Sequence, residues 1–210
     1  MDLNLLCERA RGLADRLGRR VVIGIVGAPG AGKSTLAEAL VAALGARAVL
    51  IPMDGYHLSQ RVLDELGLSD RKGAPETFDA AGLNQLLDRV HNETDQVVYF
   101  PVFDRSLEEP IAAGGGVQPN QDIVVVEGNY LLLDQGEWRG TRTRLDEAWS
   151  IEVDPELRRA RLLARHVRFG RSPQSAADWV ATVDEPNARR IKANSAPADL
   201  VIQLVEDLVP

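Results

Sequence analysis

Only one cysteine occurs among the 210 residues of this chain, at position 7. A single thiol forms no intrachain disulfide and no cysteine metal cluster, so we expect Cys7 to be buried and inert. No apolar run approaches the roughly 18 residues of a membrane-spanning helix, and the opening Met-Asp-Leu-Asn lacks the basic start of a signal peptide. We therefore expect a cytoplasmic protein with no membrane partner.

The chain also lacks an excess of positive charge. Its formal net charge is −7 and its pI is near 5.1. Nucleic acids and anionic membranes attract basic surfaces, so we expect neither as a partner. A nucleotide is not excluded, because the local field at its binding loop decides that interaction. The length suits one α/β domain, residues 1–210.

Residues 27 to 34 carry the most informative motif, Gly-Ala-Pro-Gly-Ala-Gly-Lys-Ser. It matches the phosphate-binding loop G-x-x-x-x-G-K-[ST]. An apolar run at 21–26 precedes it and helical spacing follows over 34–44, which an accidental glycine turn would lack. Backbone N–H groups and the helix N-terminus would bind phosphate oxygens, Lys33 would reach the β- and γ-phosphates, and Ser34 would bind Mg²⁺. The expected nucleotide-binding residues are Gly27, Ala28, Pro29, Gly30, Ala31, Gly32, Lys33, Ser34 and Thr35.

Strand and helix signals alternate along the rest of the chain. Strands are predicted over 21–26, 48–52, 97–103, 123–126, 149–153 and 199–204. Helices are predicted over 2–17, 34–44 and 80–90, and from Pro155 and Pro173 onward. This alternation predicts an α/β fold, a mostly parallel, doubly wound sheet with helices on both faces.

Turn signals mark the segments between these elements. Residues 58–79 are expected to be loop with short helical pieces, and Thr77 or Asp79 is expected to cap the next helix. Gly114 to Gly116 predict a mobile turn. Pro186 is expected to break or kink the last helix.

Two acidic residues follow predicted strands, where ligands bind in parallel sheets. Asp54 could accept a proton from a substrate hydroxyl, or could be a turn aspartate beside Gly55. Glu127 follows the apolar run 123–126, where a carboxylate without a cation or donors would be costly. A role beside Mg²⁺ is favoured over that of a solvated acid.

A strongly basic stretch stands out in this acidic protein; it contains Arg158, Arg159, Arg161, Arg165, His166, Arg168 and Arg171. Most of these arginines are expected to be solvated and paired with acids. Arg165 and Arg168 precede Gly170, a candidate hinge. They predict a lid over about 165–173 that closes over phosphates and stabilises transition-state charge.

Two polar segments with aromatic residues could line an acceptor pocket, 72–79 and 103–105. They supply Lys72, Glu76, Phe78, Phe103 and Arg105. A small polar substrate needs a few fixed donors and acceptors between apolar walls. Arg105 could bind a phosphate or carboxylate of the acceptor, or simply pair with Glu108 or Glu109.

Taken in order, these segments resemble the phosphoribulokinase/uridine kinase family of P-loop kinases, from Val21 to Leu204. The matching motifs are the 27–34 loop, Met-Asp-Gly-Tyr-His at 53–57, K-G-x-P-E-x-F-D at 72–79, Glu-Gly at 127–128, the arginines of 165–171 and Ala-Asp-Leu-Val-Ile at 198–202. The second and third motifs look closest to type I pantothenate kinases and their uncharacterised relatives, some named as nucleoside kinases or fructose-transport kinases.

The resemblance implies a P-loop NTPase fold and an ATP- and Mg²⁺-dependent phosphorylation of a small-molecule hydroxyl. The acceptor would be a sugar such as fructose, a nucleoside such as uridine, or pantothenate. Asp54 matches the family's catalytic base, with Lys33, Arg165 and Arg168 completing the catalytic set. Tyr56, His57 and Asn187 would contact substrate. Phe-Asp-Arg-Ser at 103–106 departs from the well-known relatives, which leaves the acceptor open.

Alternative functions remain at this point. A regulatory GTPase would normally carry N-K-x-D, and a transport ATPase a Leu-Ser-Gly-Gly-Gln-like signature; the sequence has neither. A nucleoside monophosphate kinase could use Arg105 and the lid, but its phosphate acceptor would be repelled by Asp54. Related kinases are often dimers, so a homodimer also stays open.

Overall fold

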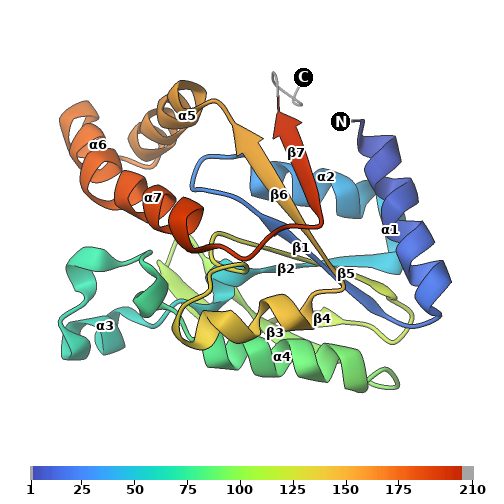
Figure 1. The fold of residues 1–210 in the computed structure, drawn as a ribbon. Coiled ribbons are helices and arrows are strands. Elements are labelled where there is room, and N and C mark those ends of the chain that lie inside the picture. Colours follow the sequence, from blue (N-terminus) through green and yellow to red (C-terminus); the bar gives the residue numbers. More distant parts are fainter. Residues whose placement is uncertain (1, 205–210) are drawn as a thin grey trace.

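A sheet of five parallel strands runs through the computed structural model, which describes residues 2–204 (Figure 1). The strand order is β2-β5-β1-β6-β7, so the chain winds in both directions from β1. The bounds are β1 Val21–Val26, β2 Ala48–Pro52, β5 Ile123–Gly128, β6 Glu147–Val153 and β7 Leu200–Leu204. The predicted doubly wound α/β sheet is confirmed.

Helices cover both faces of this sheet (Figure 1). On one face α1 (Leu3–Leu17) and α2 (Lys33–Leu44) pack on β1, β5 and β6. The buried thiol of Cys7 belongs to this core. On the other face lies α4 (Ala80–Asn92). Asp79 caps α4 by accepting from the Gly82 N–H, which decides between the two predicted caps.

A separate antiparallel pair, β3 (Val98–Asp104) and β4 (Glu109–Val117), packs beside α4. The prediction of a mobile turn at Gly114–Gly116 is wrong, because these glycines are part of β4. A Cβ on Gly115 would lie 2.4 Å from the Phe100 ring. The glycine run therefore permits close strand packing rather than a turn.

The C-terminal part is helical: α5 (Pro155–Arg168), α6 (Pro173–Trp179) and α7 (Glu185–Asn194). A π-helical turn, Val180–Asp184, joins α6 to α7 just before Pro186, at the irregularity that the proline predicts. The 58–79 segment contains α3 (Gln60–Leu66) and short turns, as expected. The 3-10 turns are Gly45–Arg47, Met53–Tyr56, Ser69–Arg71, Pro75–Thr77, Gly136–Gly140 and Arg142–Arg144. None of the described helices is long and apolar enough to cross a membrane.

Candidate functional site

The ends of three neighbouring strands place the candidate site at one edge of the sheet. Glu127 in β5 is level with Ile25 in β1 and Pro52 in β2. The 27–34 loop, Asp54 and Glu127 therefore meet where these strands end. A cleft of about 670 Å³ opens there. The predicted site residues that line it are Pro29, Lys33, Ser34, Asp54, His57, Lys72, Phe78, Phe103, Arg105, Glu127, Arg165 and Asn187.

The phosphate-binding loop owes its shape to glycine. Gly30 and Gly32 have φ of 80° and 90°, a backbone region that L side chains rarely adopt. A Cβ on Gly30 would lie 2.8 Å from the Leu162 side chain and 3.0 Å from the Arg158 carbonyl oxygen. The loop thus packs directly on α5. Its remaining predicted members are Gly27, Ala28 and Ala31, and Thr35 lies in the first turn of α2.

Arg158 is the arginine of α5 that holds this loop. Its side chain is buried; Nη1 donates to the Pro29 carbonyl at 3.3 Å and Nη2 pairs with Glu185 of α7. Sequence reasoning grouped Arg158 with solvated arginines and missed this contact. The sequence offers one indication of this contact: Arg158 lies one turn into a helix that follows a strand of the central sheet.

Lys33, Ser34 and Glu127 form the polar base of the cleft. Ser34 Oγ donates to Glu127 Oε1 at 3.2 Å, and Lys33 Nζ donates to the Ala28 carbonyl at 3.1 Å. Burial lowers the pKa of Lys33, while the charges of Glu127 and Asp54 oppose that shift. Burial raises the pKa of Glu127, and the Lys33 charge opposes it.

These groups fit a nucleoside triphosphate with Mg²⁺. The hydroxyl and the carboxylate are hard oxygen donors, and no cluster of three or more His, Cys, Asp or Glu within residues 2–204 could hold a metal by itself. Mg²⁺ is usually bound by one or two protein oxygens together with substrate phosphates and water. The donor set therefore suits an ion that arrives with a polyphosphate.

Two glycines bring Asp54 up to Glu127. A Cβ on Gly55 would lie 2.1 Å from the Pro101 carbonyl oxygen in β3, and one on Gly128 would lie 2.6 Å from Met53 Cβ. Only glycine fits at these contacts. The turn Met53–Tyr56 is therefore pressed between β3 and β5, with Asp54 facing the cleft.

Asp54 is paired with Arg105. Arg105 Nη2 donates to Asp54 Oδ2 at 2.7 Å, and the two side chains are 46% and 30% exposed. This partner is neither Glu108 nor Glu109, the two acids that the sequence suggested. Arg105 also lies 5.4 Å from the centre of the Phe103 ring, and Lys72 Nζ lies 5.7 Å from it.

His57 completes this wall of the cleft. Its Nδ1 lies 2.8 Å from the Asp54 carbonyl oxygen, which can only accept, so Nδ1 carries the hydrogen. The ring packs on Phe78 and Phe103, with centroids 4.0 and 4.9 Å apart. Burial lowers the pKa of His57, so the neutral ring is favoured. The wall is thus aromatic, with its charges on Lys72, Arg105 and Asp54.

The opposite wall comes from the C-terminal helices. Asn187 and Asp184 are buried there, and His166 Nε2 lies 2.8 Å from Asp184 Oδ2. Arg171 Cζ stacks 4.0 Å over the Trp179 ring. The sequence analysis did not select Asp184 or Trp179. They reach the cleft from the helical segment around the π-turn. In the sequence, Pro186 was the one residue that indicated an irregular helix there.

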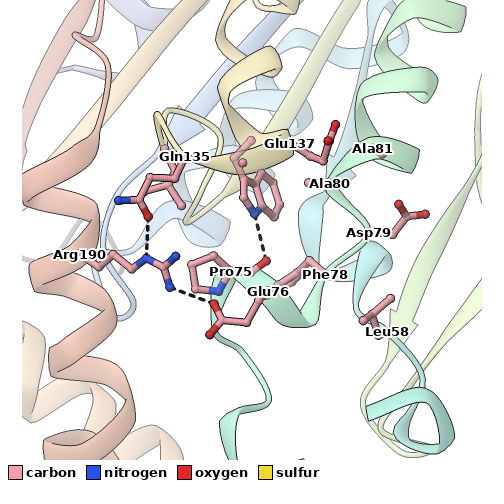
Figure 2. Close-up of a pocket in the computed structure, with 13 residues that line it drawn as sticks. Leu58, Pro75, Glu76, Phe78, Asp79, Ala80, Ala81, Gln135, Glu137 and Arg190 are labelled. Atoms are coloured by element: carbon pink, nitrogen blue, oxygen red, sulfur yellow. Dashed lines mark hydrogen bonds and ion pairs between the residues drawn. The ribbon is translucent and has the colours of Figure 1, made fainter. Parts of the chain in front are cut away.

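Of the predicted catalytic and substrate-binding residues, three lie outside the cleft lining. Arg168 is exposed at the end of α5. Tyr56 is buried, and burial raises the pKa of its phenol. Glu76 faces a second cavity of about 350 Å³ (Figure 2), where its Oε2 accepts from Arg190 Nη1 at 2.9 Å. Arg190 Nε also donates to Gln135, so Glu76 ties the 72–79 segment to α7 (Figure 2).

Comparison with known proteins gives consistent matches. The sequence profile of the AAA domain matches residues 23–172. A Schizosaccharomyces pombe protein named "putative uridine kinase C227.14" is 33% identical over 196 residues, 88% of this chain and 83% of that protein. YggC of Escherichia coli K12, called uncharacterized, is 34% identical over 194 residues, 90% of this chain and 80% of YggC.

A solved structure is also similar along nearly the whole chain. The crystal structure of a "putative fructose transport system kinase" from Silicibacter sp. TM1040 has a TM-score of 0.89 and 39% sequence identity. The match covers 96% of this chain and 99% of that one. The P-loop fold that the sequence resemblance implied is therefore confirmed.

Proposed function

This chain contains an AAA domain and belongs with the P-loop kinases to which it is similar, and from that premise we propose that it transfers the γ-phosphoryl group of ATP to a hydroxyl of a small metabolite. One observation carries the proposal: the carboxylate of Asp54 lines the same cleft as Lys33, Ser34 and Glu127. A triphosphate site with a carboxylate beside it suits transfer to a hydroxyl.

The loop 27–35 would bind the polyphosphate. Its backbone N–H groups and the N-terminus of α2 supply fixed positive dipoles, and Lys33 adds a charge at the β- and γ-phosphates. The buried position of Lys33 favours this role, because an ammonium in a low-dielectric site interacts strongly with an anion. Ser34 and Glu127 would hold Mg²⁺, which supplies charge neutralisation at the phosphates when bound.

Asp54 would act as the general base. The acceptor oxygen forms a bond to the γ-phosphorus, the bond from that phosphorus to the bridging oxygen breaks, and ADP leaves. The hydroxyl proton passes to the Asp54 carboxylate and then to water. General-base help of this kind contributes about 10²–10⁴ in rate.

The basic end of α5 would act as a lid. Arg165 lines the cleft, and Arg168 lies one turn further on at the junction with Gly170, which has φ of 94°. Movement at this junction would bring the two arginines onto the transferring group and exclude water. Arg158 is not part of this lid, because it fixes the loop to α7.

The acceptor would lie between the aromatic wall and α7. We propose His57, Lys72, Phe78, Phe103, Arg105 and Asn187 as its contacts. Tyr56 and Glu76 would not contact the acceptor. They would position the turn 53–56 and the segment 72–79, to which they belong. The names of the similar proteins suggest a nucleoside such as uridine or a sugar such as fructose, and the sequence motifs add pantothenate.

We propose one kinase domain, 1–210, in the cytoplasm, where ATP is available.

The test is ADP release from Mg·ATP with a panel of acceptors: pantothenate, uridine and other nucleosides, fructose and other sugars, and sugar phosphates. We expect one acceptor class to stimulate release. Asp54→Asn should lower that turnover by about 10²–10⁴ while ATP binding stays near normal. Exposed Asp70, outside the cleft lining, gives the matched control Asp70→Asn.

Unchanged turnover in Asp54→Asn would contradict the base assignment. Nucleoside monophosphates as the stimulating acceptors would indicate a nucleoside monophosphate kinase instead. Tight nucleotide binding with no stimulation by any acceptor would point to a regulatory NTPase.

A further inference from the structure

We infer that Arg105 is a clamp on Asp54 that an anionic acceptor releases. The acceptor would carry a carboxylate or phosphate near its reactive hydroxyl, and Arg105 together with Lys72 would bind that group. The inference rests on the function proposed above and names the acceptor class of the same site.

The first step is the contact between Arg105 and Asp54. The guanidinium donates to Oδ2 at 2.7 Å from the turn between β3 and β4, 51 residues along the chain from Asp54. One carboxylate oxygen of the proposed base is thus occupied, and the guanidinium stands beside it in the cleft. Oδ1 is not bonded to Arg105; in this proposal the acceptor hydroxyl approaches Oδ2, on the side where the guanidinium lies, so the pair has to open before proton transfer.

The second step is Lys72, a cation beside Arg105 whose charge acts on Asp64 without forming an ion pair with it. Its Nζ donates to two neutral oxygens, the Glu108 carbonyl at 2.9 Å and Gln60 Oε1 at 3.3 Å. Among the ion pairs of residues 2–204, Lys72 has none. Both cations lie within 6 Å of the Phe103 ring and line the cleft. They form a two-cation patch, which we call the Lys72–Arg105 patch.

The third step is the charge balance around this patch. The acids that line the cleft are Asp54, Glu108, Glu127 and Asp184. Glu127 accepts from Ser34 and Asp184 contacts His166, and the ion pairs of residues 2–204 include none between the Glu108 carboxylate and the patch. His57, in the same aromatic wall, has its pKa lowered by burial, which favours the neutral ring over a third positive charge. An acceptor anion would supply the missing counter-charge to Lys72.

The fourth step is the exchange of partners. Exposed ion pairs stabilise a protein only slightly, because water and salt screen them. An acceptor anion that contacts both Lys72 and Arg105 can therefore displace Asp54 from the guanidinium. A neutral acceptor has no charge to offer Arg105, so the guanidinium stays on the Asp54 carboxylate when that acceptor binds. Selection for anionic acceptors follows from the geometry.

Binding tests the clamp without any turnover. The probes are matched pairs, glycerol and glycerate, fructose and fructose 1-phosphate, and pantothenol and pantothenate, with inorganic phosphate as a further probe. Calorimetry is done with saturating Mg·ADP so that the phosphate loop is filled. We expect wild type to bind an anionic member better than its neutral partner.

The variants then separate the contacts. Arg105→Ala and Lys72→Ala should each weaken anion binding about tenfold, since each removes a charge-assisted hydrogen bond. Asp54→Asn should tighten it about two- to fivefold, because Arg105 no longer has a competing partner. The double variant Asp54→Asn/Arg105→Ala should lose that gain. Arg61→Ala, which removes an exposed arginine of α3 outside the cleft, is the matched control.

Turnover gives the second readout. In Arg105→Ala we expect ADP release with the anionic acceptor to fall about tenfold in kcat/KM, while release with its neutral partner rises. A merely structural role for Arg105 would lower both, and that result would overturn the inference. So would anion binding that Asp54→Asn fails to tighten, or anionic probes that fail to bind at all.

The two proposals fail separately. Turnover that survives Asp54→Asn removes the proposed base, although the binding cycle still reports on the clamp. Rapid, Asp54-dependent turnover of neutral acceptors alone keeps the kinase and removes the clamp.

Discussion

Lys33 and Glu127 show how single residues set the chemistry of the cleft. Both are buried, so burial lowers the pKa of Lys33 and raises that of Glu127, and the charge of each is the main influence that opposes the shift of the other. Such a pair is costly in the absence of a ligand and becomes favourable when phosphates and a cation are present. The charge of Glu127 should therefore matter for metal binding more than for folding.

Glu127→Gln tests this at the residue scale. The amide keeps the size of the side chain and an acceptor for Ser34 but removes the charge. We expect the Mg²⁺ concentration for half-maximal ADP release to rise about tenfold, in line with the weakening expected on loss of a supporting carboxylate. The free energy of unfolding should change by less than about 1 kcal/mol, because Lys33, whose pKa burial lowers, can lose its proton and so avoid an unpaired buried charge.

A magnesium titration of ADP release measures the first effect, and urea unfolding measures the change in free energy of unfolding. Glu65→Gln, on the exposed side of α3, is the control. A magnesium titration identical to that of wild type would contradict the role of Glu127.

At the scale of elements, the turn after β2 is positioned by close backbone contact. Gly55 touches the Pro101 carbonyl in β3, and Gly128 touches Met53. A rotamer change relieves neither contact fully, because the Pro101 carbonyl belongs to the backbone and the Cβ of Met53 does not move when its side chain rotates. The pair β3–β4 therefore holds the turn that carries Asp54, and it also carries Phe103 and Arg105.

Gly55→Ala should disturb this arrangement. An added methyl group would have to push β3 away, so we expect a loss of about 1–3 kcal/mol in unfolding free energy, with a larger loss of turnover than of ATP binding. The control is Gly12→Ala on α1, where nothing lies within 4 Å of an added Cβ. That change should stabilise the protein by up to about 1 kcal/mol.

Urea unfolding and ADP release measure both variants. A Gly55→Ala protein as stable and as active as wild type would show that the turn can move without cost.

At the scale of the whole molecule, a buried arginine ties three regions together. Arg20 precedes β1, is 4% exposed, and burial lowers its pKa. Its guanidinium donates to four carbonyl oxygens at 2.8–3.0 Å, those of Val90, Glu93, Gln118 and Gln121. The end of α4 and the link between β4 and β5 are thereby fixed to the central strand.

Arg20→Met keeps the length of the side chain and removes every donor. Four carbonyl oxygens would lose their charged partner, so we expect the free energy of unfolding to fall by about 3–5 kcal/mol. Arg16→Met, an exposed change on α1, should stay within about 0.5 kcal/mol of wild type. Thermal and urea unfolding measure both; equal stability of the two variants would contradict this role of Arg20.

Much of the fold was readable along the chain. The phosphate loop between β1 and α2, the caps at Asp79 and Asp154, and the strand runs are local patterns, so periodicity and capping chemistry suffice to predict them. Asp54 and Glu127 were selected as candidates because parallel strands end at a common edge, and both line the cleft there. Gly114 to Gly116 were mistaken for a turn, because the side chains of the 97–102 segment that pack against them are not near them in sequence.

The sequence by itself determined the class of fold, the phosphate loop and the two strand-end acids. Each depends on neighbouring residues, whose sterics and hydrogen bonding act without the rest of the chain. Only the tertiary structure decided that Arg105 binds Asp54, that Arg158 holds the loop and that Glu76 turns to Arg190. These partners are 51 to 129 residues apart, and an arginine pairs with whichever carboxylate or carbonyl oxygen the packing of the elements brings within reach.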